Sequence, residues 1–109
     1  MQMETLRGGI SDLVNTLNKL GNNTTNPEEQ EKLQKVLRVL FMLWEEVIRQ
    51  TLDSSTAAYK DALQALSGAG QTAEEAIKDI NKIGDAIKAA VRAAKAVDAV
   101  VGIIGPILL

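Results

Sequence analysis

The sequence predicts an all-α protein: a long antiparallel helical hairpin with a shorter N-terminal helix packed on one half, forming a coiled-coil-like three-helix bundle. Apolar residues recur at spacings of three and four, and β-branched residues form no alternating runs. The two prolines, Pro27 and Pro106, lie near the ends of periodic segments. A chain of 109 residues with 46% hydrophobic residues suits a single helical domain over residues 1–109.

The first helix is expected over about residues 3–20. Its apolar positions follow one stripe along a helix, and Gly21 is expected to end it, because glycine is the residue most often found just past a helix end. A polar segment, GNNTTN, then forms the loop. The stripe consists of Leu6, Ile10, Leu13, Leu17 and Leu20.

The second helix is expected over about residues 27–67. Asn26 can cap it, Pro27 suits its first position, and Glu29 can bond back to the cap. A bend is possible at residues 52–56, where short polar side chains compete for backbone hydrogen bonds. The residues expected on its inward stripe include Leu33, Leu37, Leu40, Phe41, Trp44, Ile48, Leu52, Tyr59, Leu63 and Leu66.

The third helix is expected over about residues 72–104, after a turn at residues 68–70 and a capping box at residues 72–75. Pro106 is expected to stop it, leaving an apolar tail at residues 105–109. The stripe of this helix is Ala73, Ala76, Ile80, Ile83, Ile87, Ala90, Ala94, Val97, Val101 and Ile104.

Short loops would place the first and third helices side by side and parallel. In that register Leu6, Ile10, Leu13 and Leu17 lie beside Val97, Val101, Ile104 and Leu108. Arg7 would then contact Asp98, and most of the apolar tail would have a partner inside the protein.

The composition argues against catalysis. The chain has no His and no Cys, which removes the commonest bases, nucleophiles and transition-metal ligands. Its paired glutamates are adjacent in sequence, so the members of a pair do not share a helix face. No glycine-rich phosphate-binding motif is present. We therefore expect no enzyme activity, no catalytic residue, no cofactor and no metal.

The leading functional hypothesis is a non-enzymatic helical protein that acts through protein–protein contact, as a homo-oligomer or with another helical protein. In the predicted hairpin, the half not covered by the first helix is only two helices thick, which leaves apolar residues for a partner. Tyr59 suits a partner contact and an internal contact equally, and Trp44 is either a core residue or an exposed anchor. The candidate interface is Ala58, Tyr59, Ala62, Ala65, Ile77 and Ile80.

The alternative function is membrane association through a basic stripe and the apolar tail. The simplest interpretation of that stripe is a solvated helix face. A net charge of −2 and a pI near 5.1 argue against nucleic acid. The start resembles no secretory signal, and no apolar run could span a bilayer, so a cytoplasmic location is expected. The candidate stripe for an anionic partner is Lys78, Lys82, Lys88, Arg92 and Lys95.

Overall fold

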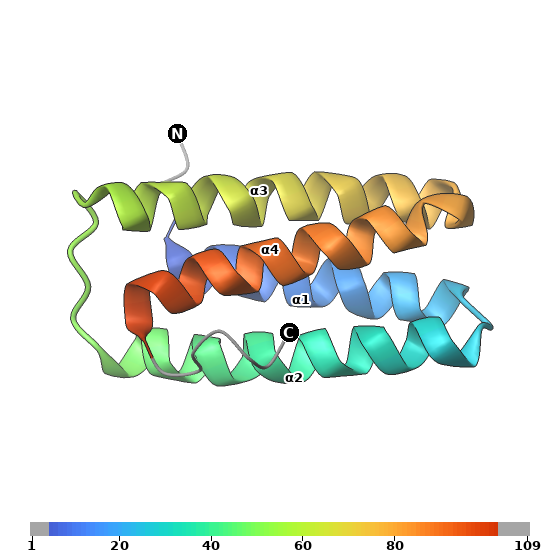
Figure 1. Ribbon diagram of the computed structural model, residues 1–109, viewed down its shortest axis with the longest axis horizontal. Helices are drawn as coiled ribbons and strands as arrows, with labels where there is room; N and C mark the ends of the chain where they lie inside the picture. The colour runs from blue at the N-terminus through green and yellow to red at the C-terminus, as the bar shows by residue number, and fades with distance from the viewer. Residues whose placement is uncertain (1–4, 103–109) are drawn as a thin grey trace.

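The computed structural model describes residues 5–102, and the helices of this region pack into a bundle without strands (Figure 1). The predicted all-α bundle is confirmed. The described region holds four α-helices where three were expected, and a short 3₁₀ turn, η1 (Ile80–Lys82), precedes the last of them. The helices are α1 (Leu6–Asn23), α2 (Pro27–Arg49), α3 (Ala57–Lys78) and α4 (Ile83–Val101).

The four helices form a flattened bundle in which each helix runs opposite to the one before it in the chain (Figure 1). Both α1 and α4 pack chiefly against α2 and α3, so α2 and α3 occupy the far edges. As a result α1 is parallel to α3, and α2 is parallel to α4. The Cα atoms extend over 39 × 34 × 18 Å, which gives the molecule two broad faces.

The predicted start of α2 is confirmed. The Asn26 side chain accepts hydrogen bonds from the backbone N–H groups of Glu28 and Glu29, at 2.9 and 3.3 Å, and Pro27 occupies the first helical position. Glu29 was expected to bond back to the cap, but its carboxylate accepts from the Thr24 hydroxyl at 3.3 Å, and the Asn26 N–H donates to the Thr24 hydroxyl oxygen at 3.3 Å. Gly21 was expected to end the preceding helix, but α1 continues to Asn23.

The predicted single helix over residues 27–67 is wrong, because α2 ends at Arg49 and residues 50–56 cross to the other edge of the bundle. Local hydrogen bonds hold this crossing. The Asp53 carboxylate accepts from the hydroxyl and the backbone N–H of Ser55, at 2.6 and 2.9 Å, and these bonds lower the pKa of Asp53. The Thr56 hydroxyl then caps α3 by accepting from the Tyr59 N–H at 3.2 Å.

The predicted turn at residues 68–70 is also wrong, because α3 continues through it. Its buried residues keep alternating spacings of three and four across Gly68 and Gly70, so the helix presents one unbroken face to the core. Thr72, expected in a capping box, donates from its hydroxyl to the Gly68 carbonyl at 2.9 Å. The buried residues are Tyr59, Ala62, Leu66, Ala69, Ala73 and Ala76.

The chain reverses at Asp79, about ten residues after the predicted turn. Asp79 has an extended backbone, and its carboxylate accepts from the Asn81 N–H at 3.2 Å at the start of η1. The predicted helix over residues 72–104 is therefore two helices. Gly102 ends α4 in a left-handed conformation with φ 71°. The predicted stop at Pro106 and the apolar tail at residues 105–109 lie outside the described residues.

The additional reversal changes the register. Since α4 runs antiparallel to α1, the predicted parallel alignment of residues 6–17 with residues 97–108 is wrong (Figure 1). Arg7, predicted to contact Asp98, lines a hollow beside Ile48 of α2. The apolar stripe of α1 packs instead between α2 and α3. At the beginning of this stripe, the Tyr59 hydroxyl of α3 accepts a hydrogen bond from the buried Leu6 N–H at 3.2 Å.

We predict that Gly68→Ala and Gly70→Ala each raise the free energy of unfolding by about 0.5–1 kcal/mol, because alanine favours a helix interior over glycine. A Cβ at either position would meet no atom within 4 Å. The measurement is urea denaturation. Gly102→Ala is the control and should lower stability, because its φ of 71° disfavours a side chain. A loss of stability in the first two variants would contradict a continuous α3.

Candidate functional site

α2 carries two apolar stripes rather than the single stripe expected from the sequence. The first faces the core and is fully buried. The second follows spacings of four, three and four, and at 100° per residue it is rotated by roughly a quarter turn from the first. The core stripe includes Leu33, Val36, Leu40 and Leu43, and the outer stripe consists of Leu37, Phe41, Trp44 and Ile48.

The outer stripe is incompletely covered. Phe41 is 55% exposed and Ile48 is 47% exposed, whereas Leu37 and Trp44 are half-buried. The rings of Phe41 and Trp44 are stacked, with centroids 5.8 Å apart and planes 20° from parallel. Trp44 is thus neither a core residue nor fully exposed. Contiguous apolar side chains left partly open to water mark interaction surfaces more often than isolated ones do.

The outer stripe forms one wall of a shallow groove between α1 and α2. Three hollows follow one another along this α1–α2 groove, pairing Asn18 with Leu37, Val14 with Phe41, and Arg7 with Ile48. The central hollow is also lined by Ser11 and Asn15 of α1 and by Trp44. Among residues 5–102, Arg7 is the only charged side chain that lines these three hollows, so the described part of the groove is nearly neutral.

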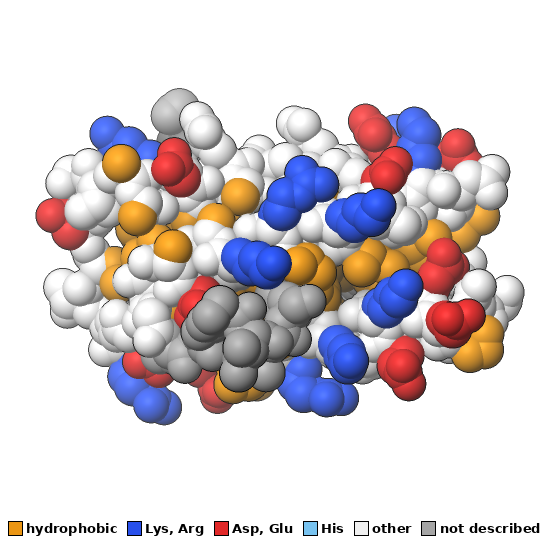
Figure 2. Space-filling model, in the orientation of Figure 1, with side chains coloured by type: hydrophobic (Ala, Val, Ile, Leu, Met, Phe, Trp, Pro, Cys, Tyr) orange, Lys and Arg blue, Asp and Glu red, His pale blue; other side chains and the backbone are white. Residues whose placement is uncertain are grey.

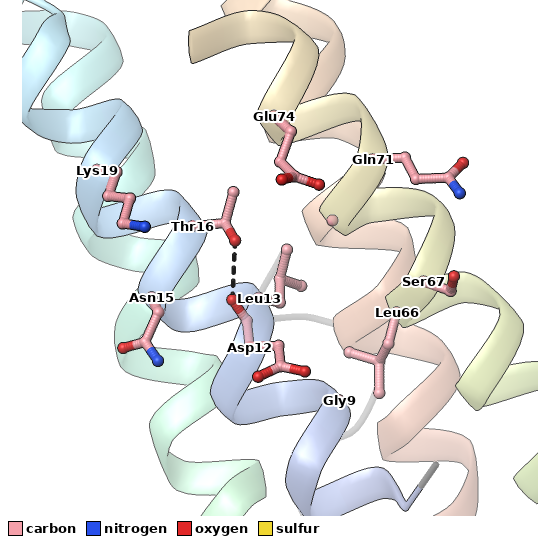
Figure 3. Close-up of a pocket in the computed structure, with 11 residues that line it drawn as sticks. Gly9, Asp12, Leu13, Asn15, Thr16, Lys19, Leu66, Ser67, Gln71 and Glu74 are labelled. Carbon is pink, nitrogen blue, oxygen red and sulfur yellow. Dashed lines mark hydrogen bonds between the residues drawn. The ribbon is translucent and has the colours of Figure 1, made fainter. Parts of the chain in front are cut away.

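A larger hollow, of about 580 Å³, opens on the other side of α1, against α3 (Figure 3). Asp12 and Lys19 come from α1 and Glu74 comes from α3, while the Thr16 hydroxyl donates to the Asp12 carbonyl at 2.9 Å. In Figure 3 the two carboxylates lie at different levels of the hollow and do not point at a common centre. This arrangement offers no paired acid and base for catalysis.

No metal centre can be assigned within residues 5–102, where no three potential ligands among His, Cys, Asp and Glu come together. The ionisable side chains of this region are mostly on the surface. The two ion pairs formed there within 4.0 Å are Glu46–Arg49 at 3.9 Å and Glu75–Lys82 at 4.0 Å. Each pair joins partly exposed side chains, so it contributes little to stability.

The predicted interface on residues 58–80 loses its physical basis, because α1 covers α3 and no half of the bundle is only two helices thick (Figure 1). Tyr59 and Ala62 are buried within the chain and are unavailable to a partner. Ala65 and Ile77 are half-buried, and Ala58 is exposed. Ile80 is 40% exposed in η1.

The predicted basic stripe is divided by the turn before α4. Lys78 ends α3, and Lys82 lies in η1, where its ammonium group is 4.0 Å from the Glu75 carboxylate. The other three members share the exposed side of α4. They are Lys88, Arg92 and Lys95.

Two cations of α2, Lys32 and Lys35, extend the α4 group across to the neighbouring helix. Figure 2 shows Lys and Arg side chains gathered over the middle of the broad face that α2 and α4 share. Sequence reasoning missed these two because about 50 residues separate them from the α4 group. The sequence feature that could have indicated this basic group is the absence of Asp and Glu from residues 32–44 and 86–97.

The chain matches no protein-family model, no curated protein and no solved structure. Between residues 5 and 102, every helix is too short or too polar to cross a membrane. The surfaces that stand out are the α1–α2 groove, with its apolar stripe, and the basic side of α2 and α4.

We predict that Leu40→Ala costs about 2–5 kcal/mol of stability, because it leaves a cavity in the core. Phe41→Ala should cost at most about 1 kcal/mol, since it removes a half-exposed side chain and its stacking on Trp44. The measurement is urea denaturation of both variants. Equal costs would show that Phe41 faces the core, as the sequence suggested, and that the two-stripe description of α2 is incorrect.

Proposed function

We propose that this protein is a non-enzymatic helical protein that acts through protein–protein contact, and that its main contact is with a second copy of itself across the α1–α2 groove. The observation that carries the proposal is the outer stripe of α2. Its side chains follow the spacing of a helix–helix seam, yet α1 covers them only in part.

A helix is the partner that fits this groove. Seam residues at spacings of four, three and four interdigitate with a facing helix as knobs into holes. Apart from Arg7 at one end, the α1 wall of the described region consists of small or uncharged residues, such as Ser11, Val14 and Asn18, which allow close approach. The broad face that contains the groove measures 39 × 34 Å, enough for the roughly 800 Å² per partner that a stable interface buries.

The outer stripe favours a second copy of the chain as the partner. Its spacings of four, three and four residues are the same in both directions along α2, so two copies can pair antiparallel. Two α2 helices related by a two-fold axis run antiparallel, so the midpoint between Phe41 and Trp44 would lie on that axis. Phe41 of each copy would then meet Trp44 of the other, and Leu37 would meet Ile48. Both contacts match one apolar side chain with another.

The charges beside the stripe support the same pairing. Arg38 and Glu45 lie on the outer side of α2, next to the stripe and away from α1. In the antiparallel arrangement, Arg38 of one copy is within about one turn of Glu45 of the other. Opposite charges at such flanking positions set the orientation of paired helices.

We predict that the protein is a dimer at tens of micromolar and that Phe41→Glu combined with Ile48→Glu makes it monomeric, because two carboxylates would be buried at the seam. Sedimentation equilibrium gives the mass of the particle. Met42→Glu is the matched control: Met42 is 43% exposed on the same helix but points away from the groove, so this variant should stay dimeric. A monomeric wild type overturns the proposal.

The antiparallel pairing is tested by exchanging charges. Arg38→Glu should weaken the dimer about two- to tenfold, because it places two acidic residues opposite each other at each end of the seam. Arg38→Glu together with Glu45→Arg should restore the wild-type dissociation constant. Sedimentation at several concentrations measures both. If the double variant is as weak as the single one, the two charges do not face each other and the register is different.

A further inference from the structure

We propose that the exposed side shared by α2 and α4 docks on the surface of an anionic lipid bilayer. This basic face consists of Lys32 and Lys35 of α2 together with Lys88, Arg92 and Lys95 of α4. It differs from the α1–α2 groove and would bind lipid whether or not the protein dimerises. The occupant is therefore a membrane surface and not a second copy of the chain.

Packing of α2 on α4 brings these cations together. The two helices are neighbours and run parallel, and the Gln50 side-chain amide donates to the Val101 carbonyl at 3.2 Å. This bond joins residues 51 positions apart. With that offset Lys35 is level with residue 86 in the first turn of α4, about half a turn before Lys88. Cations from two distant segments therefore form one group, as the basic side chains in Figure 2 show.

Among residues 5–102 no ion pair within 4.0 Å neutralises this face, although Glu31, Asp85 and Asp98 lie close to its members in the sequence. Residues 32–44 and 86–97 contain no Asp or Glu, although the chain as a whole has 14 acidic and 12 basic residues. All five side chains are exposed, and within residues 5–102 none of them lies within 4.0 Å of a carboxylate. Lys82, by contrast, has Glu75 at 4.0 Å. A positive field is therefore concentrated on one side of a protein whose net charge is −2.

The shape of the face favours a planar partner. The bundle is 18 Å thick and its broad faces measure 39 × 34 Å, so all five cations can approach a flat surface together. A nucleic-acid surface is less suited, because no aromatic side chain is available here to stack on a base. The stacked pair, Phe41 and Trp44, lines the α1–α2 groove instead.

The sequence that follows α4 supports a lipid partner. After Gly102 the chain continues as IIGPILL, seven residues without a charge. Basic residues near an anionic leaflet each strengthen binding about fivefold. Stable association of a peripheral protein with a membrane usually combines such a basic patch with an apolar element.

The experiment is flotation of the full chain with lipid vesicles. We expect binding to phosphatidylcholine vesicles that contain about 30% phosphatidylserine, and none to pure phosphatidylcholine vesicles. Binding should fall steeply between about 0.1 and 0.5 M salt, because the screening length shortens over that range. Lys88→Glu combined with Arg92→Glu should weaken binding by at least about 25-fold, since both charges are reversed.

The matched control is Lys19→Glu combined with Lys60→Glu, which changes the net charge equally but at exposed cations on α1 and α3. This control should bind nearly as well as the wild type. An equal loss in both double variants would mean that only net charge matters and would overturn the proposal. Circular dichroism confirms that every variant is folded.

Three other results would overturn the proposal. The first is no flotation of the wild type, and the second is unchanged flotation of the Lys88→Glu, Arg92→Glu variant. The third is salt-sensitive binding to a duplex oligonucleotide, lost in that variant, without binding to vesicles. The Phe41→Glu, Ile48→Glu variant should float like the wild type, so failure of the dimer and failure of lipid binding can be told apart.

Discussion

The close contact between α1 and α3 determines most of this fold. A Cβ atom on Gly9 of α1 would lie 3.1 Å from the Leu66 Cδ1 of α3, so a side chain at this position would require Leu66 to shift by a few tenths of an ångström. For α3 to remain beside α1, it must stay helical through Gly68 and Gly70. The chain must then reverse before α3 begins, at residues 50–56. The fourth helix, its direction and the covered surface of α3 all follow from this contact.

The sequence predicted the local features correctly and the long-range choice incorrectly. The cap at Asn26 and the helical spacing of apolar residues depend only on neighbours along the chain. Whether the chain turns at residues 50–56 or at Gly68–Gly70 depends on which of the two folds has the lower free energy. Two glycines inside a helix cost about 2 kcal/mol, and burying several side chains of α3 against α1 offsets that cost. The weakness at residues 52–56 was visible in the sequence, but nothing local made it decisive.

The α1–α2 groove and the basic face could not be predicted from the sequence for the same reason, since both depend on how distant helices pack. α2 has apolar residues on two adjacent stripes, and only the position of α1 and α4 decides that Leu40 is buried while Phe41 remains half-exposed. Three of the five residues of the basic face could be predicted from α4 alone. Lys32 and Lys35 join it because α2 and α4 are parallel neighbours, which a three-helix arrangement would not have produced.

The position of α2 at one edge of the flattened bundle explains why both surfaces involve it. An edge helix packs against two neighbours, here α1 and α4, and keeps much of its circumference open to water. Its apolar stripe turns toward α1 and its cations turn toward α4, so the two proposed surfaces lie on opposite sides of one helix. Burial of the outer stripe in a dimer would leave Lys32 and Lys35 exposed. Arg38, on the side of α2 farthest from the core, lies between the stripe and these two lysines. Self-association and lipid binding would therefore not compete, and a dimer would present one basic face for each copy of the chain.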